Sequence, residues 1–411
     1  MYMYQIKAPH GINGINIALP ASKSLTNRAL LLNALSGNRC HVANMADCDD
    51  SRLLLAALQS SATTKDLGAA GTALRFSTAY YAMMPGVWVI TGSERMKKRP
   101  IGILVEALRQ LGADIEYLGQ EGYPPLRVTG HPLRGGQVCI DGSVSSQFLS
   151  ALMMIAPLME QGLCMKLENT LNSRPYLDMT ADMMRHFGVY IRWKGREIII
   201  PSRPYEPPRQ YSIEADWSAA SYWYETLSLY SQGRLLLRGL RRESLQGDAR
   251  VADWFAQLGV RTTFGAEGCL LESVPTASRY FIEDFRHQPD LAQTFAVTLA
   301  LKGIPFHLKG LESLRIKETD RLSALVCEMG KLGYEFIIKG DDLIWKGRRT
   351  DPGKAQVVID TYEDHRMAMA FAPASVVSDV PLVIRHPEVV GKSYPDFWQH
   401  LLQAGFDLKE I

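Results

Sequence analysis

Four charged residues stand together in the segment IKETDRLSAL, at positions 316 to 325, directly before an apolar run. If this segment opens a helix, Lys317 and Arg321 lie one turn apart, where like charges repel by roughly a few tenths of a kcal/mol. Glu318 and Asp320 lie between them. A solvated helix face is the ordinary explanation of such a run. The alternative is that the two cations bind an anion.

Basic residues recur where other apolar helices are expected to begin. Helix amino termini carry unpaired N–H groups and the positive end of the dipole, so they favour anions. Eight cations occupy such points: Lys23, Arg28, Arg75, Arg99, Lys317, Arg321, Arg366 and Lys392. Polar side chains accompany them: Ser24, Ser145, Ser146, Gln147 and Ser173. Any single Ser is more often a helix cap, but the whole set predicts a site for phosphate, carboxylate and hydroxyl groups.

Carboxylates are found at the same kind of position. Asp290, Glu318 and Asp320 lie at expected helix starts, and among so many cations they would be ionised and placed for proton transfer. Charge balance is at least an equal explanation for Asp320 and for Asp49, whose segment DCDDS is interpreted as a helix-capping cluster. His365 has the best context of the nine histidines and is a candidate only.

The composition excludes several classes of protein. The 411-residue chain has a net charge of +2, so no general basic field points to nucleic acid. Its six cysteines show no CxxC pair or metal-ligand spacing, which indicates reduced thiols. The amino terminus lacks the pattern of a secretory signal, and the longest apolar run, 148–159, is too short to span a membrane. GKS at 391–393 is not a P-loop, because His386 stands where the first glycine should be. We expect a cytoplasmic protein.

The chain repeats itself with a period of about 74 residues. Amphipathic helical segments end in glycine and pass into strand-like segments five times, at Gly112, Gly188, Gly259, Gly333 and Gly405. Glycine just past a helix takes the left-handed conformation at little cost. The spacings, 71 to 76 residues, predict a repeated structural unit.

A second helix recurs with the same period and is apolar on most sides, as helices inside a domain are. Its six copies begin near residues 22, 70, 143, 217, 290 and 364. Short alternating runs such as PLRVTG, GQVCIDG and REIIIPS predict strands between the helices. The pattern predicts an α/β protein of six repeats, three in each of two similar lobes. The first repeat is shorter by about 25 residues and lacks the glycine stop and a strand pair.

Several segments together resemble one enzyme family. PASKSLTNRALLLNAL, AGTALR, RMKKRPIG, DGSVSSQFLSALMM, QGDAR, IKETDRL and YEDHRMAMA are similar to the motifs of the 5-enolpyruvylshikimate-3-phosphate synthases. The resemblance runs from about residue 5 to residue 408. It implies two lobes of three βαβαββ units, an inside-out α/β barrel type of fold. The expected lobes are residues 20–215 and residues 1–19 with 216–411, and the expected active site is the cleft between them.

The family's reaction implies the substrates and their binding residues. It joins shikimate 3-phosphate to phosphoenolpyruvate in the pathway to chorismate and the aromatic amino acids, without metal or organic cofactor. The residues carried over for shikimate 3-phosphate are Lys23, Ser24, Arg28, Ser145, Ser146, Gln147, Ser173, Tyr176, Asp290, Ser313 and Lys317. Those for phosphoenolpyruvate are Lys23, Gly71, Arg99, Gln147, Arg321, Arg366 and Lys392. Supporting positions are Thr72, Arg75, Asp49, Asp320 and His365.

The reaction moves two protons. The 5-hydroxyl loses one as it attacks C2 of phosphoenolpyruvate, and C3 gains one. Asp290 and Lys317 are the expected groups on the hydroxyl side, Glu318 is expected on the C3 side, and Lys23 completes the catalytic set. Under this interpretation substrate anions offset the repulsion between Lys317 and Arg321. The family resemblance also implies a monomer and inhibition by glyphosate.

Three features depart from the family pattern: Ala69 replaces the usual Asn of GNAGT, Ser313 replaces another Asn, and the first repeat is short. Two rival functions stay open. One is the sister enolpyruvyl transferase that acts on UDP-N-acetylglucosamine, although TGSERMKKR at 91–99 lacks that family's usual loop cysteine. The other is a non-catalytic anion-binding homologue, which would need the cations but not Asp290 and Glu318.

Overall fold

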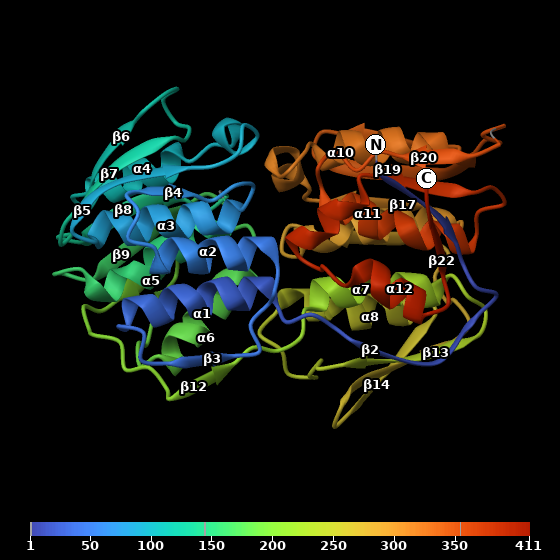
Figure 1. The fold of residues 1–411 in the computed structure, drawn as a ribbon, viewed down its shortest axis with the longest axis horizontal. Helices are drawn as coiled ribbons and strands as arrows, with labels where there is room; N and C mark the ends of the chain where they lie inside the picture. The colour runs from blue at the N-terminus through green and yellow to red at the C-terminus, as the bar shows by residue number, and fades with distance from the viewer. Residues whose placement is uncertain (1, 144, 354) are drawn as a thin grey trace. The chain divides into compact units, whose positions relative to one another are not determined.

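The computed structural model describes residues 2–143, 145–353 and 355–411. The chain divides into two compact lobes. The N-terminal lobe is Ala21–Ile213, and the C-terminal lobe joins the residues up to Pro20 to Glu214–Ile411. In each lobe the strands lie mainly on the outside and the longest apolar helices lie inside (Figure 1).

The N-terminal lobe contains six described α-helices and ten described strands. Its helices are α1 (Lys23–Leu35), α2 (Asp49–Gln59), α3 (Gly71–Met83), α4 (Gly102–Gln110), α5 (Ser146–Ile155) and α6 (Arg174–His186), with short 3-10 helices at Met96–Lys98 and Ala156–Leu158. Its strands are β3 (His41–Ala43), β4 (Thr64–Asp66), β5 (Gly86–Thr91), β6 (Asp114–Tyr117), β7 (Leu126–Gly130), β8 (Gly136–Asp141), β9 (Leu163–Glu168), β10 (Arg192–Lys194), β11 (Glu197–Ile200) and β12 (Gln210–Ser212).

The C-terminal lobe contains six described α-helices and twelve described strands. Its helices are α7 (Trp217–Ser228), α8 (Val251–Gln257), α9 (Ala292–Leu301), α10 (Arg321–Lys331), α11 (His365–Phe371) and α12 (Phe397–Gln403), with 3-10 helices at Gly247–Arg250, Pro289–Leu291, Glu312–Ile316, Ala372–Val376 and Pro387–Lys392. Its strands are β1 (Met3–Lys7), β2 (Ile12–Ala18), β13 (Gly233–Arg238), β14 (Val260–Gly265), β15 (Gly268–Ser273), β16 (Phe281–Asp284), β17 (Phe306–Lys309), β18 (Tyr334–Lys339), β19 (Asp342–Arg349), β20 (Val357–Ile359), β21 (Leu382–Arg385) and β22 (Asp407–Glu410).

Five of the six described sheets share one order: a parallel pair followed by two antiparallel strands. In the N-terminal lobe they are β4-β5-β7-β6 and β8-β9-β11-β10. In the C-terminal lobe they are β2-β13-β15-β14, β16-β17-β19-β18 and β20-β21-β1-β22. The repeated order confirms the predicted α/β fold of similar units.

The sixth sheet contains only the parallel pair β12-β3. Strand β3 belongs to the first repeat, and after α2 the chain goes directly to β4 of the next sheet. The antiparallel pair that would follow β3 in the other five sheets has no counterpart in the described residues. This is the strand pair that the sequence predicted to be missing.

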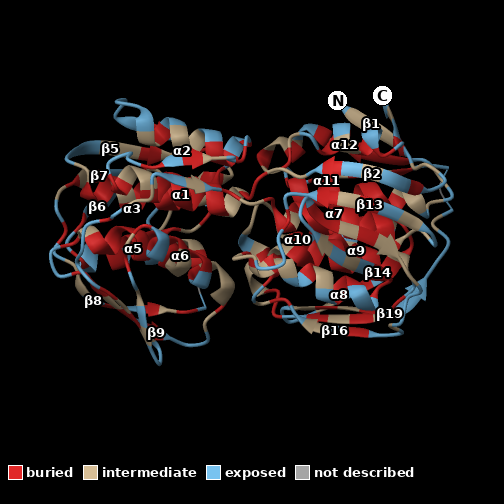
Figure 2. Cartoon of the chain, turned by 90° about the horizontal axis from the view of Figure 1, so that it is seen from below, coloured by how far each residue is buried: buried red, intermediate tan, exposed pale blue. Residues whose placement is uncertain are grey.

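The second helix of the repeat is buried on nearly every side, as its composition predicted. In α7, α9 and α11 only Ser218 and Leu301 are not fully buried. The buried residues form the interior of each lobe (Figure 2). Because these helices have no exposed face, charge is placed mainly at their ends.

The five glycine stops adopt the expected conformation. Gly112, Gly188, Gly259, Gly333 and Gly405 all have positive φ, between 86° and 103°. Each lies just past the end of an outer helix: α4, α6, α8, α10 or α12. The left-handed turn lets the chain leave the helix and enter the next strand.

Alanine substitution of two of these glycines should distinguish the stability lost to the left-handed backbone from the stability lost to steric crowding. A Cβ on Gly333 would lie 1.9 Å from the Thr350 carbonyl oxygen, whereas on Gly405 the nearest atom would be Pro9 Cβ at 3.5 Å. We expect Gly405→Ala to lose roughly 1–2 kcal/mol of unfolding free energy from the left-handed backbone alone. Gly333→Ala should lose roughly 1–3 kcal/mol more from overpacking. Chemical denaturation measures both, and equal losses would contradict the crowding argument.

A carboxyl group is buried inside the C-terminal lobe without a charged partner. Glu225, in α7, is 0% exposed, and neither of its carboxylate oxygens accepts a hydrogen bond. The hydroxyl of Thr298 approaches it but donates instead to the Thr294 carbonyl oxygen at 2.7 Å. Burial raises the pKa of Glu225 well above its ordinary value. The folded protein therefore holds the proton of Glu225 up to a higher pH than the unfolded chain does.

Stability should fall with rising pH because of Glu225. The unfolded chain ionises this group near its ordinary pKa while the folded chain does not, so stability is lost as pH rises from there toward the raised pKa. Glu225→Gln removes the effect, and its advantage should grow by up to about 1.4 kcal/mol per pH unit. Thermal unfolding at several pH values measures it.

Glu328 is the matched control for this substitution. It is also 0% exposed, but it accepts from Tyr362 Oη at 2.6 Å and lies 2.6 Å from Lys331 Nζ. Glu328→Gln should therefore destabilise the protein at neutral pH. If Glu225→Gln destabilised it equally at neutral pH, the protonated state assigned to Glu225 would be wrong.

Candidate functional site

The segment around Lys317 does not form the helix start that the sequence predicted. Helix α10 begins at Arg321, because the side chain of Asp320 caps it by accepting from Leu322 N at 3.1 Å and Ser323 N at 3.3 Å. Lys317 lies before the helix in an extended conformation. The expectation that Lys317 and Arg321 stand one helical turn apart is therefore wrong.

Arg321 is the centre of an ion-pair cluster in the C-terminal lobe. Its side chain is 1% exposed, and its guanidinium contacts three carboxylates: Asp364 at 2.7 Å, Glu318 at 2.9 Å and Asp290 at 3.2 Å. Burial lowers the pKa of Arg321, but the three carboxylates more than offset this, so the pKa is raised. The guanidinium stays charged at every accessible pH.

Three more cations complete the cluster. Lys392 Nζ lies 3.0 Å from Glu318 Oε1, Arg366 Nη2 lies 2.9 Å from Asp290 Oδ2, and Lys317 Nζ lies 3.8 Å from Asp290 Oδ1. With Arg321 there are four cations for three carboxylates. The cluster is mostly buried and carries an excess positive charge, which suits an anionic ligand.

Two residues of the cluster are not among the site residues predicted from the sequence. Asp364 is 0% exposed, pairs with Arg321, and caps α11 by accepting from Arg366 N at 2.9 Å. Tyr222 Oη accepts from Arg366 Nη1 at 3.2 Å, and burial raises the pKa of Tyr222 to about 12. An Asp before a helix was visible in the segment EDHRMAM, but its ion pair with Arg321 was not.

The other predicted residues of this lobe surround the cluster. His365 is buried, with Nδ1 3.6 Å from Asp364 Oδ1. Asp320 caps α10 and lies 3.7 Å from Arg315, which is a structural role. Ser313 is half-buried in the 3-10 helix Glu312–Ile316.

Of the cations predicted in the N-terminal lobe, Lys23, Arg28 and Arg75 belong to inner helices, and Arg99 follows the 3-10 helix Met96–Lys98. Lys23 is the first residue of α1 and lies 3.5 Å from Asp50 of α2. Asp50 is buried, whereas the neighbouring Asp49 is 58% exposed and pairs with Arg52. The predicted capping role of DCDDS is wrong, because the cap position of α2 is Cys48, which makes no side-chain cap. The buried carboxylate near Lys23 is Asp50.

The guanidinium of Arg28 donates its hydrogen bonds to oxygen atoms of the protein. Its side chain is buried and donates to Thr180 Oγ1 at 2.7 Å, Ser150 Oγ at 3.1 Å, and the backbone carbonyl oxygens of Ser24 at 3.0 Å and Tyr176 at 3.4 Å. Burial lowers the pKa of Arg28 to about 10. These contacts join α1, α5 and α6 and fix the guanidinium in one position.

A second basic group lies at the start of α3. Arg75 is buried and donates to the carbonyl oxygens of Gly71 at 3.0 Å and Pro100 at 3.1 Å. Arg99 is 7% exposed, and its Nε has no hydrogen-bond partner among the described residues. A Cβ on Gly71 would lie 2.6 Å from Arg99 Nη1. The missing side chain of Gly71 therefore makes room for the Arg99 guanidinium.

Polar groups adjoin this basic group. Gln147 Nε2 donates to Thr72 Oγ1 at 3.0 Å, which links α5 to α3. Ser145 caps α5 by accepting from Gln147 N at 3.4 Å. Ser146 is buried in the first turn of α5, and Ser173 precedes α6 with φ of 53°. These hydrogen-bonding groups lie at the amino ends of α3, α5 and α6.

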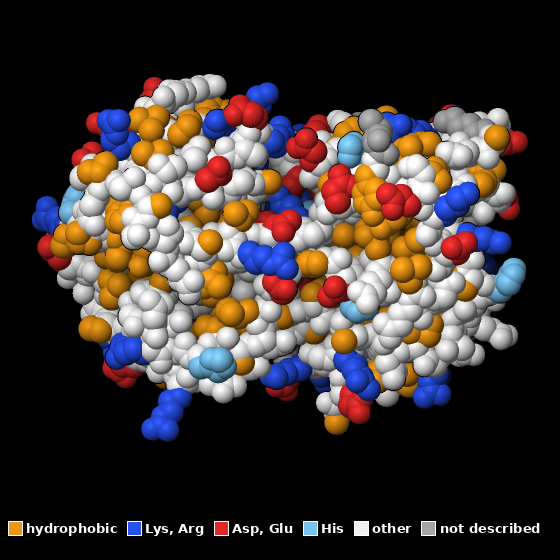
Figure 3. Space-filling view, in the orientation of Figure 1, with side chains coloured by type: hydrophobic (Ala, Val, Ile, Leu, Met, Phe, Trp, Pro, Cys, Tyr) orange, Lys and Arg blue, Asp and Glu red, His pale blue; other side chains and the backbone are white. Residues whose placement is uncertain are grey.

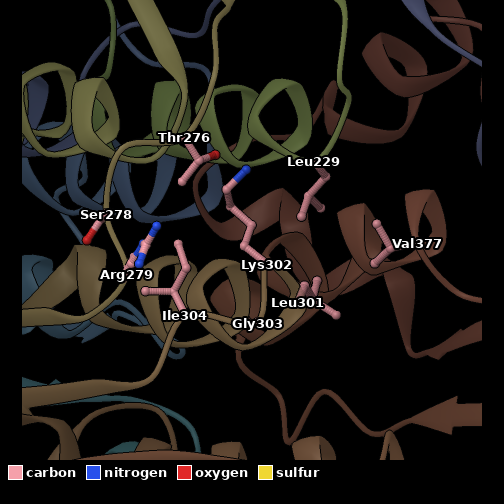
Figure 4. Close-up of a pocket in the computed structure, with 9 residues that line it drawn as sticks. All are labelled: Leu229, Thr276, Ser278, Arg279, Leu301, Lys302, Gly303, Ile304 and Val377. Carbon is pink, nitrogen blue, oxygen red and sulfur yellow. The ribbon is translucent and has the colours of Figure 1, made fainter.

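A cavity of about 410 Å³ in the C-terminal lobe contains none of the predicted site residues (Figure 4). It is lined by Leu229, Thr276, Ser278, Arg279, Leu301, Lys302, Gly303, Ile304 and Val377. Lys302 Nζ donates to the Ser228 carbonyl oxygen at the end of α7. Because that contact caps a helix, Lys302 has a structural role there.

Acidic and basic side chains are both scattered over the visible surface, among apolar and neutral polar groups (Figure 3). Among the residues that the structure describes, no three His, Cys, Asp or Glu side chains are grouped so that they could hold a metal ion. In the same part of the chain, no helix has the length and apolar character needed to cross a membrane.

The fold is that of the enolpyruvyl transferases. An EPSP synthase structure from Acinetobacter baumannii matches with a TM-score of 0.78, at 20% identity, over 100% of both chains. The enolpyruvyl transferase NikO from Streptomyces tendae matches with a TM-score of 0.71, at 13% identity, over 100% of this chain and 99% of the other. At these identities the likeness establishes the fold alone.

Sequence comparison identifies the family. The family model described as EPSP synthase (3-phosphoshikimate 1-carboxyvinyltransferase) matches residues 6–61 and 58–401. The 3-phosphoshikimate 1-carboxyvinyltransferase of Bacteroides fragilis strain YCH46 is 48% identical over 99% of this chain and 98% of its own length. That of Vibrio atlanticus strain LGP32 is 38% identical over 94% and 95%. The chain belongs to the EPSP synthase family, a family of transferases.

Removing the central guanidinium should be costly because it leaves three carboxylates without their shared cation. We expect Arg321→Met to lower the free energy of unfolding by about 3–5 kcal/mol, the usual cost of breaking a buried pair. Arg315→Met is the control, since Arg315 is 36% exposed and pairs with exposed Asp341. Its loss should be at most about 1 kcal/mol. Denaturant unfolding compares them, and similar losses would rule out a central role for Arg321.

Proposed function

We propose that this protein transfers the enolpyruvyl group of phosphoenolpyruvate to the 5-hydroxyl of shikimate 3-phosphate. The products are 5-enolpyruvylshikimate 3-phosphate and inorganic phosphate. Family membership supports the reaction class. The observation that carries the proposal is the buried cluster around Arg321, in which carboxylates and an excess of cations lie together.

We assign the anion-binding roles by motif and by charge. The proposed ligands of phosphoenolpyruvate are Lys23, Gly71, Arg99, Gln147, Arg321, Arg366 and Lys392. The proposed ligands of shikimate 3-phosphate are Lys23, Ser24, Arg28, Ser145, Ser146, Gln147, Ser173, Tyr176, Asp290, Ser313 and Lys317. The unpartnered Nε of Arg99 supports an anion at that position.

The proposed chemistry is addition followed by elimination. In the addition, the 5-hydroxyl oxygen bonds to C2 of phosphoenolpyruvate, its proton passes to Asp290 with the help of Lys317, and Glu318 gives a proton to C3. In the elimination, the C2–O bond to phosphate breaks, the departing phosphate takes the proton held by Asp290, and Glu318 takes a proton back from the methyl group. Buried cations that face the developing charge lower the barrier.

The surroundings of Glu318 suit a general acid whose protonation state changes when the substrate binds. In the structure its carboxylate lies 3.0 Å from Lys392 and 2.9 Å from Arg321. An anion that draws Lys392 toward itself leaves Glu318 with less positive charge nearby. A carboxylate in that position binds a proton more readily, as the C3 step requires.

The test is phosphate release from purified protein with phosphoenolpyruvate and either shikimate 3-phosphate or UDP-N-acetylglucosamine. We expect release only with shikimate 3-phosphate. Release only with UDP-N-acetylglucosamine would favour the sister activity. No release from folded protein with either acceptor would favour a non-catalytic anion-binding homologue. Light scattering and cell fractionation would test the predicted monomer and cytoplasmic location.

Substitutions of the two proposed catalytic carboxylates should distinguish an enzyme from a protein that only binds anions. We expect Asp290→Asn and Glu318→Gln each to lower kcat about 10²–10⁴-fold, the range for losing a general acid or base. Asp341→Asn is the control, because Asp341 pairs with Arg315 and is exposed; it should keep normal kcat. Full turnover by both active-site variants would make the catalytic assignment wrong.

A further inference from the structure

A buried carboxyl group next to the cluster has no role in the reaction described above. Asp248 belongs to the segment QGDAR and lies in the 3-10 helix Gly247–Arg250. It is 4% exposed. Its Oδ2 accepts from Ser218 Oγ at 2.5 Å, and its Oδ1 has no hydrogen-bond partner among the described residues. A buried oxygen without a partner is unusual enough to need an explanation.

Helix α7 connects Asp248 to the cluster, because Ser218, which donates to Asp248, lies one helical turn from Tyr222, which accepts from Arg366. Three charged groups act on Asp248. They are Asp290 of the 3-10 helix Pro289–Leu291, Arg366 of α11, and Asp216, which caps α7. In the described part of the chain no Lys or Arg nitrogen lies within 4.0 Å of a carboxylate oxygen of Asp248, whereas Asp290 contacts three cations at 2.9 to 3.8 Å. The cations therefore stabilise the charge on Asp290 and leave Asp248 without a counter-ion.

Two neighbouring carboxyl groups in a buried place do not both ionise cheaply. Burial, followed by the charge of Asp290, raises the pKa of Asp248 to about 7, while the Ser218 hydrogen bond and Arg366 offset part of the rise. Where the environment moves the pKa values of two carboxyl groups apart in this way, one group commonly acts as a base and the other stays neutral. Here the geometry makes Asp290 the ionised member.

We propose that Asp248 is a positioning residue that acts through Asp290 and Arg366: in its protonated form it leaves their ion pair intact, and its ionisation weakens the site. This inference rests on the proposed function. When Asp248 loses its proton to solvent, a second negative charge competes for Arg366. Less positive charge is then available to Asp290 and to an anionic substrate.

The first measurement is kcat/KM for phosphoenolpyruvate as a function of pH. Wild-type protein should lose activity on the alkaline side, by about tenfold per pH unit for one essential proton. Asp248→Asn keeps the side chain neutral and nearly the same size, so this alkaline limb should disappear. Ser218→Ala removes a hydrogen bond that favours the ionised form, so the limb should move to higher pH. Asp253→Asn, on the exposed face of α8, should keep the wild-type profile.

The second measurement does not depend on turnover. The infrared difference between wild-type protein and Asp248→Asn, near pH 6, should contain the band of one protonated carboxyl that titrates away at higher pH. Absence of that band would overturn the inference even in an active enzyme. An unchanged alkaline limb in Asp248→Asn would overturn it as well.

The two proposals fail in different ways. If wild-type protein releases no phosphate while the band titrates, the proposed function is rejected and so is the catalytic role of Asp248, but its assigned protonation state is upheld. If wild-type protein releases phosphate normally and Asp248→Asn has the same pH profile as the wild type, the proposed function holds and the role of Asp248 is rejected.

Discussion

The burial of the inner helices on nearly every side is the constraint on which the rest of the structure depends. A helix such as α7 or α9 has no solvent-facing side on which charged residues can be placed. The polar groups that function requires are therefore found at the helix ends, where unpaired N–H groups favour them. The repeat brings the same kind of end into each lobe several times. A set of basic and hydroxyl side chains follows from the packing of apolar helices.

Arg321 shows what such a position demands energetically. A guanidinium that is 1% exposed loses its hydration, and three carboxylates replace the lost water contacts. Two of those carboxylates are in turn held by further cations, Asp290 by Lys317 and Arg366, and Glu318 by Lys392, so each of these two is balanced by more than one cation. A network of this kind is costly to break at any single member. It is also preorganised, because its charges are fixed before a ligand arrives.

The sequence predicted the features that depend on local signals. The glycine stops and the inner helices were correctly expected, since a left-handed turn and an all-round apolar helix can be recognised from a few neighbouring residues. Of the cations expected at helix starts, Lys23, Arg321 and Arg366 lie there, whereas Lys317 precedes α10 and Lys392 ends a 3-10 helix. The sequence predicted the start of α10 four residues too early. The helix begins at Arg321 because the Asp320 side chain accepts hydrogen bonds from the backbone N–H groups of its first turn.

The carboxylate partners could not be predicted in the same way. Asp364 is 43 residues from Arg321 in the chain, and Asp50 meets Lys23 across two helices. Such pairs depend on tertiary packing, about which one sequence carries no direct signal. The same limit applies to Asp248, whose segment was noticed in the sequence but whose link to Arg366 through Ser218 and Tyr222 of α7 only the fold reveals.

The path of the chain has a consequence for its synthesis. The N-terminal lobe, Ala21–Ile213, is continuous, so all of its strands and helices leave the ribosome in one stretch. The C-terminal lobe instead needs β1 to pair with β21 and β22, whose residues are made last. Pairings of such high sequence separation form slowly, and domains generally fold as units in the order of synthesis. Strand β1 must therefore remain without these partners until β21 and β22 have been made, and exposed strand edges of this kind are the ones that chaperones protect.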